Sequence, residues 1–129
     1  MNFKKLYQLA SKISAKRKLT KYANCGGVGC ALITSKGNIY TGICIDTRCA
    51  LGFCAEHAAI ADMLKHGESE IAEIVAVKES RKNAVVPPCG RCRELMLQID
   101  RNNERTLVYI GANKSERLSK LLPEHWLVE

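Results

Sequence analysis

The chain of 129 residues is long enough for one domain with a hydrophobic core, which we place at 1–129, and too short for two of ordinary size. No apolar run approaches the roughly 20 residues that would span a bilayer, and the N-terminal segment lacks the continuous apolar stretch of a signal peptide. Seven cysteines without an export signal argue against a disulfide framework and favour a reduced, cytoplasmic protein whose thiols serve a metal or a reaction. The net charge of +7 arises within residues 1–21, because the 13 basic residues beyond them are balanced by 13 acidic ones.

Apolar residues repeat at helical spacing near the N-terminus and predict a helix over about 3–17. We interpret the lysines between them as a solvated helix face, and the alternative is a surface that binds anions or nucleic acid. The sequence "NCGGVG" then predicts a break in the chain. Beyond the break, "VGCALITSKGNIYTGICID" is typical of a hairpin with strands over 28–34 and 38–45.

The second half of the chain alternates between helices and strands. Helices are expected over about 54–66, ending before Gly67, and over about 89–100. Strands are expected over about 71–79 and 106–112, and a short helix capped by Ser115 should follow the last of them. This order predicts a mixed sheet with helices covering both faces.

The strongest chemical signal is the cysteine pair Cys89 and Cys92 in "PCGRC". Two cysteines at this spacing form half of a zinc site, although thioredoxin-like redox motifs share the spacing. A redox motif normally follows the first strand of a βαβ unit, whereas this pair lies late in the chain and opens a helix. Cys54, at the start of the other helix in "CAE", supplies a third thiolate. Three protein ligands with a fourth position left for water are the pattern of a catalytic zinc site.

The neighbours of these cysteines indicate what the site does. Helix N-termini stabilise thiolates. Three thiolates exceed the charge of Zn²⁺ by one, so we expect His57 and Arg93 to compensate it; for His57, plain helix packing is an equal alternative. Glu56 follows Cys54 by two residues, so its carboxylate can lie beside the metal-bound water without being a ligand.

The order Cys-x-Glu and then Pro-Cys-x-x-Cys is the pattern of zinc nucleobase deaminases. The chain resembles the cytidine deaminases, particularly the three-cysteine branch that includes blasticidin S deaminase. The resemblance rests on "CAE" at 54–56, "PCGRCRE" at 88–94, "VGCAL" at 28–32 and "LLPEHW" near the C-terminus. It implies a three-layer α-β-α fold with a mixed five-stranded sheet, one Zn²⁺ per chain, and a homotetramer.

The implied activity is hydrolysis of a cyclic amidine, which converts the cytosine ring of a free nucleoside to uracil and releases ammonia. Glu56 would be the catalytic residue and would move protons between water, the ring nitrogen and the departing ammonia. The resemblance also implies a set of substrate contacts, with backbone at two of the positions meeting the base edge and a tryptophan as pocket wall or subunit contact. The residues are Cys44, Asp46, Ala55, Pro88 and Trp126.

Two positions depart from the ordinary cytidine deaminases. Cys44 stands where that family usually has an asparagine that holds the ribose, and Gly26 stands where it has a phenylalanine. A thiol is a weak hydrogen-bonding partner, and glycine offers no ring for stacking. We therefore expect weak discrimination among sugars, with cytidine, deoxycytidine or a modified cytosine nucleoside such as blasticidin S as substrate.

Two other classes of function remain open. A deaminase that acts on a base in nucleic acid is favoured by the basic N-terminal helix and disfavoured by the small number of aromatic residues. A non-catalytic zinc-binding module is disfavoured by Glu56, for which a structural site has no use. We expect a small-molecule substrate and neither a membrane nor a nucleic acid as partner.

Overall fold

Alternating apolar side chains place β2 (Ala23–Thr34) at the centre of the sheet. The computed structural model describes residues 2–127. In it, Cys30 and Leu32 pack on one side of β2, and Ala31 and Ile33 pack on the other. The described chain contains the helices α1 (Phe3–Lys12), α2 (Ala55–Lys65), α3 (Gly90–Ile99) and α4 (Leu118–Leu121), and the strands β1 (Arg17–Lys18), β2, β3 (Ile39–Thr47), β4 (Ile71–Lys78), β5 (Ala84–Val85), β6 (Leu107–Gly111) and β7 (Lys114–Arg117).

The sheet is mixed, as predicted. β2 pairs antiparallel with β3 along one edge and with β4 along the other. β4 runs parallel to β6, and β6 pairs antiparallel with β7. The five longer strands thus lie in the order β3-β2-β4-β6-β7, while the two-residue strands β1 and β5 add to β2 and β4.

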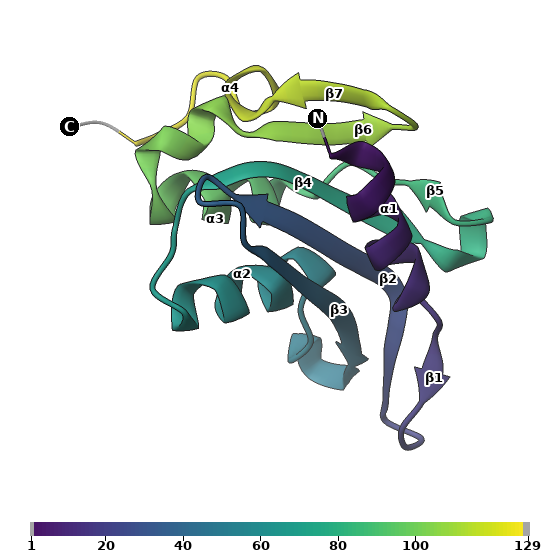
Figure 1. The fold of residues 1–129 in the computed structure, drawn as a ribbon. Coiled ribbons are helices and arrows are strands. Elements are labelled where there is room, and N and C mark those ends of the chain that lie inside the picture. Colours follow the sequence, from purple (N-terminus) through teal and green to yellow (C-terminus); the bar gives the residue numbers. More distant parts are fainter. Residues whose placement is uncertain (1, 128–129) are drawn as a thin grey trace.

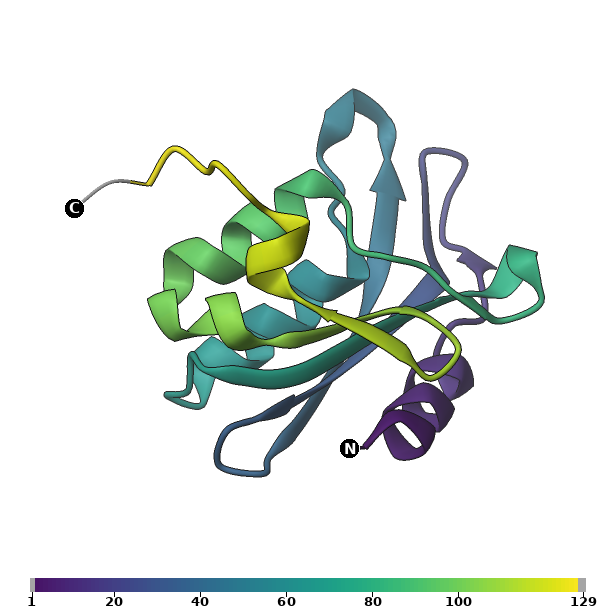
Figure 2. The same ribbon diagram turned by 90° about the horizontal axis from the view of Figure 1, so that it is seen from above.

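Helices cover both faces of this sheet, which confirms the predicted three-layer arrangement (Figures 1 and 2). On one face, α1 buries Leu6 and Ala10 against apolar residues of β2, β4 and β6. On the other face, α2 and α3 pack side by side over the larger cluster, which includes Ile60 and Met96. Within residues 2–127, no helix is both long enough and apolar enough to cross a membrane.

The predicted break at "NCGGVG" is wrong, because this segment belongs to β2. Gly26 and Gly27 adopt positive φ angles of 79° and 90°. The register of β2 against β3 shifts between Cys25 and Gly29, so the glycines form a bulge and the strand continues through them. The Gly27 N–H donates to the Ser14 carbonyl at 2.7 Å, which fixes the bulge to the segment that follows α1. That segment has left the helix, and α1 ends at Lys12 instead of continuing to 17.

The C-terminal prediction also needs correction, because the predicted helix from Ser115 begins three residues later. Residues 114–117 instead form β7, in which Ser115 pairs with Tyr109 of β6. Asn113, at a positive φ of 54°, makes the tight turn that returns the chain along β6. Strand pairing therefore prevails over the local helical signal, and α4 spans only Leu118–Leu121.

Candidate active site and metal centre

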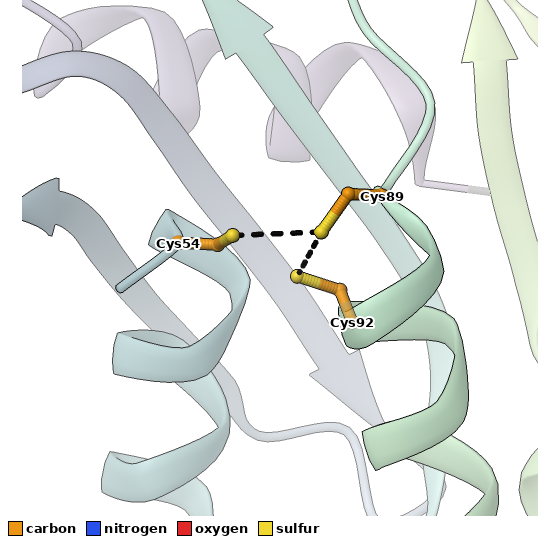
Figure 3. Close-up of side chains that lie close together, drawn as sticks. All are labelled: Cys54, Cys89 and Cys92. Atoms are coloured by element: carbon orange, nitrogen blue, oxygen red, sulfur yellow. Dashed lines mark hydrogen bonds between the residues drawn. The ribbon is translucent and has the colours of Figure 1, made fainter. Parts of the chain in front are cut away.

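Three cysteine thiols meet where α2 and α3 begin (Figure 3). Cys54 and Cys89 are the extended residues that precede α2 and α3, and Cys92 lies in the first turn of α3. The Cys89 sulfur lies 3.6 Å from the Cys54 sulfur and 3.4 Å from the Cys92 sulfur. Because the first backbone N–H groups of a helix have no partner within it, both helices direct partial positive charge toward the thiols.

The donor set and its spacing fit a zinc ion. With Zn–S bonds of about 2.3 Å, two ligands of a tetrahedral site lie about 3.8 Å apart. All three sulfurs lie within 4.8 Å of one another, and the cysteines are free rather than joined in disulfides. These three residues could therefore hold the metal and leave a fourth position open. Cys92 is buried, whereas Cys89 is exposed, so the site has one closed side and one open side.

The environment of the thiols shows why a cation suits the site. Burial raises the pKa of both Cys54 and Cys92. Burial also works against ionisation of Cys89, but hydrogen bonds from the backbone and the thiol of Cys92 lower its pKa below the ordinary value. Three neighbouring thiolates would be costly without a compensating positive charge, and a bound metal supplies it.

Glu56 lies in the first turn of α2, and its side chain is only 5% exposed. Burial raises the pKa of its carboxyl group, while a hydrogen bond from its own backbone N–H opposes the shift. Glu56 lines the same cavity as Cys54 and Cys89 but is not part of the three-thiol group. A buried carboxyl with a raised pKa beside a metal site is suited to accepting and returning a proton.

The two side chains expected to compensate charge have different surroundings. The His57 ring nitrogen Nδ1 lies 3.4 Å from the Cys92 sulfur. Burial lowers the pKa of His57, and the positive charge of Arg91 lowers it further. Arg93 instead donates from Nε to the Pro88 carbonyl at 2.8 Å and from Nη1 to the Leu121 carbonyl at 3.0 Å. Arg93 therefore braces the backbone that leads into Cys89.

A cavity of about 840 Å³ opens in front of the thiols. This volume lies within the range of small-molecule sites. Three of the predicted substrate contacts, Cys44, Asp46 and Ala55, line it. Pro87 lines it as well, whereas Pro88 is buried and is not among the lining residues.

Trp126 does not line this cavity either. Its side chain is 69% exposed, and its indole N–H donates to the Glu94 carboxylate at 3.1 Å. Glu94 is the acidic residue that follows Cys92 by two positions, yet it too lies outside the cavity lining. The role of Trp126 in binding substrate stays a prediction.

The structure shows what surrounds Gly26 and Cys44, the two positions that differ from the residues usual in cytidine deaminases. A side chain at Gly26 would overlap the carbonyl of Ala15, and the positive φ there strains any other residue. The Cys44 thiol donates to the Gly26 carbonyl at 2.8 Å. The Cys44 thiol therefore already has a hydrogen-bond partner within the protein.

Several residues that line the cavity were not predicted from the sequence. They are Lys16, Gly27, Val28, Gly52, Phe53, Lys78, Glu79, Ser80, Arg81, Val86 and Arg91. Arg91 and Phe53 could have been found, because they stand within or directly beside the cysteine motifs. Lys16 and the segment 78–81 carry no local signal, since only the pairing of β2 with β1 and with β4 brings them to the cavity.

Residues 2–112 match the family model described as the cytidine and deoxycytidylate deaminase zinc-binding region. A probable cytidine deaminase of Dictyostelium discoideum is 33% identical over 92 residues, which cover 67% of this chain and 62% of the relative. The blasticidin-S deaminase of Bacillus cereus is 36% identical over 76 residues, which cover 54% of each protein. The matches thus span between half and two thirds of the length of these relatives.

The fold has close counterparts among solved structures. The crystal structure of cytidine deaminase from Mycobacterium tuberculosis superposes with a TM-score of 0.80, with 99% of each chain covered and 24% sequence identity. At this identity the likeness establishes the fold alone. It agrees with the mixed sheet and the helix layers described above.

Proposed function

The chain belongs to the cytidine and deoxycytidylate deaminase family, and from this premise we propose that it is a zinc-dependent hydrolase that deaminates the cytosine ring of a free nucleoside or nucleoside-like compound. The observation that carries the proposal is a cluster of three thiols, two of which line the same cavity as a buried carboxyl group. The reaction consumes one water molecule, replaces the ring amine by a carbonyl oxygen, and releases ammonia.

Each residue of the centre has a separate task in this proposal. Cys54, Cys89 and Cys92 hold the zinc, which when bound supplies Lewis-acid activation of water. Glu56 takes one proton from the attacking water and delivers it to the ring nitrogen, and it then takes the second proton from the added hydroxyl and delivers it to the leaving amine. Its burial excludes bulk water from the carboxylate, which keeps the transferred proton within the site.

Two further side chains support the thiolates. His57 lies against the Cys92 sulfur and can donate a hydrogen bond to it. Arg93 acts through the backbone, because its two hydrogen bonds hold the Pro88 and Leu121 carbonyls and so fix the entry to α3. We propose that both residues support the metal ligands without contacting substrate.

The residues expected near the sugar of the substrate support an enzyme that accepts different sugars. The Cys44 thiol is engaged by Gly26, and the backbone at Gly26 excludes a side chain. Asp46 is then the polar side chain from β3 that remains to accept a sugar hydroxyl, while backbone at Ala55 meets the base. With few fixed polar partners for the sugar, discrimination among sugars should be weak.

We propose further that the chain is a single domain that acts in the cytoplasm as a homotetramer. Free thiols in all seven cysteines suit a reducing compartment. Large apolar side chains lie exposed at Leu19, Tyr22, Leu51 and Trp126, and such surface suits subunit contacts.

The test is an ammonia-release assay on the purified protein with cytidine, 2′-deoxycytidine, 2′,3′-dideoxycytidine, blasticidin S, cytosine, guanine and adenosine. We expect turnover of the cytosine nucleosides, with kcat/KM values within about tenfold of one another. A strong preference for cytidine that is lost without the 3′-hydroxyl would contradict our interpretation of Cys44 and Gly26. Absence of turnover with every compound would remove the proposed activity.

A further inference from the structure

A single aromatic side chain lines the cavity that opens beside Cys54 and Cys89. Of the lining residues within the described part of the chain, only Phe53 carries an aromatic ring, and 38% of its surface is exposed. It directly precedes the metal-ligand candidate Cys54. The pyrimidine ring of a substrate must approach the same point, so Phe53 is the residue best placed to offer it a flat apolar surface.

The backbone of Phe53 is held rigidly. Its N–H donates to the Ile45 carbonyl and its own carbonyl accepts from the Ile45 N–H, each at 3.0 Å. Both polar groups of the Phe53 backbone are thus used by β3, and what the residue offers the cavity is its ring. A side chain at the preceding Gly52 would overlap the Ile45 carbonyl, so glycine there permits the close approach of the two segments. The bridge thus fixes the backbone from which the ring projects before any ligand binds.

The other apolar lining residues supply no aromatic ring. Gly26 and Gly27 present bare backbone, and Val28 and Val86 present small aliphatic side chains. An offset or edge-to-face contact between a ring and an aromatic ligand adds to simple apolar burial. In this cavity such a contact requires Phe53.

We propose that Phe53 is the residue that positions the substrate, by packing its ring against the pyrimidine nucleoside. This inference rests on the proposed function for the identity of the ligand. The ring binds substrate and transition state alike, so its loss acts on KM more than on kcat.

The first experiment compares Phe53→Leu and Phe53→Tyr with the wild type. Leucine keeps apolar area but removes the ring, so KM for cytidine should rise about 2- to 13-fold, with kcat within about twofold. Tyrosine keeps the ring, so KM should return to within about twofold of wild type. Phe3→Leu is the matched control, because it makes the same substitution at a residue that packs in the cluster under α1 and lies outside the cavity lining. An unchanged KM in Phe53→Leu, or a rise that Phe53→Tyr does not reverse, would overturn the proposal.

The second experiment reads binding without turnover and applies even where Phe53→Leu fails to fold. Trp126, the single tryptophan, lies outside the cavity lining, so the wild type gives the background signal for a reporter at position 53. Phe53→Trp, titrated with uridine, should show a saturable change in fluorescence beyond any change that the wild type shows. A flat titration at uridine concentrations that inhibit the wild-type enzyme would overturn the proposal. A wild type that deaminates no cytosine compound would instead reject the proposed activity, and titration of the reporter with cytidine would still decide whether nucleoside meets the ring.

Discussion

Replacement of Glu56 by glutamine separates the proton-transfer role of this residue from every structural one. Glutamine matches the volume of glutamate, so the substitution leaves no cavity around a side chain that is only 5% exposed. Because burial raises the pKa of Glu56, the fold disfavours its charged form, and a neutral amide removes that penalty. The metal-free variant should therefore melt at or above the temperature of the metal-free wild type. Zinc content should stay at about one per chain, since Glu56 is not among the three thiol donors.

The turnover rate of Glu56→Gln, unlike its stability and zinc content, should fall sharply. An amide cannot accept a proton from water and return it to the ring, and a positioned acid–base group contributes about 10²–10⁴ in rate. At about 1.36 kcal/mol for each factor of ten, this loss corresponds to about 2.7–5.4 kcal/mol in the activation barrier. The assay is steady-state ammonia release under saturating substrate, with zinc measured on the same samples.

Glu94 provides the matched control for this experiment. It follows Cys92 by two residues, as Glu56 follows Cys54, but its carboxylate accepts from Trp126 and Gln98 and lies outside the cavity lining. Glu94→Gln should therefore keep kcat within about twofold of the wild type. If Glu56→Gln turned over like the wild type, or if both variants lost activity equally, the proposed role of Glu56 would be wrong.

Two further predictions concern the metal and the stability. Alanine at Cys54, Cys89 or Cys92 should lower the zinc measured per chain well below one, and full occupancy in any variant would remove that cysteine from the site. Burial alone would raise the pKa of Glu73, but hydrogen bonds from Tyr109, at 2.5 Å, and from the N-terminal backbone lower it below 4.5. Because the pKa of Glu73 is lower in the folded protein than in the unfolded chain, its ionised carboxylate stabilises the fold at any pH above the pKa of the unfolded state. This contribution to stability is lost as the pH falls below about 4.5. Thermal melts of the wild type and of Glu73→Gln between pH 6 and pH 3 should converge on acidification, and a constant difference across that range would contradict this origin of stability.

The residues at the centre of the candidate site could be predicted from the sequence alone, because the motifs that carry them are short. Cys89 and Cys92 are three residues apart, so a helix that begins at the first of them places both thiols on the same turn. Cys54 and Glu56 are fixed in the same way at the start of α2. The longer strands β4 and β6 and the helices α2 and α3 were also predicted to within a residue or two at each end, because each carries a continuous apolar pattern.

Tertiary structure alone decided what surrounds that centre. Gly26 and Gly27 suggested a chain break, and only the pairing of β2 with its neighbours made them a bulge inside a strand. Ser115 carried a helix-capping signal, but the partner strand β6 drew it into the sheet. Phe53 reaches the cavity through its bridge to Ile45. Such contacts join residues far apart in the chain, so the free energy of each contact depends on partners that no local sequence pattern specifies. The walls of the pocket therefore follow from tertiary packing, whereas the three candidate metal ligands follow from the spacing of cysteines in the sequence.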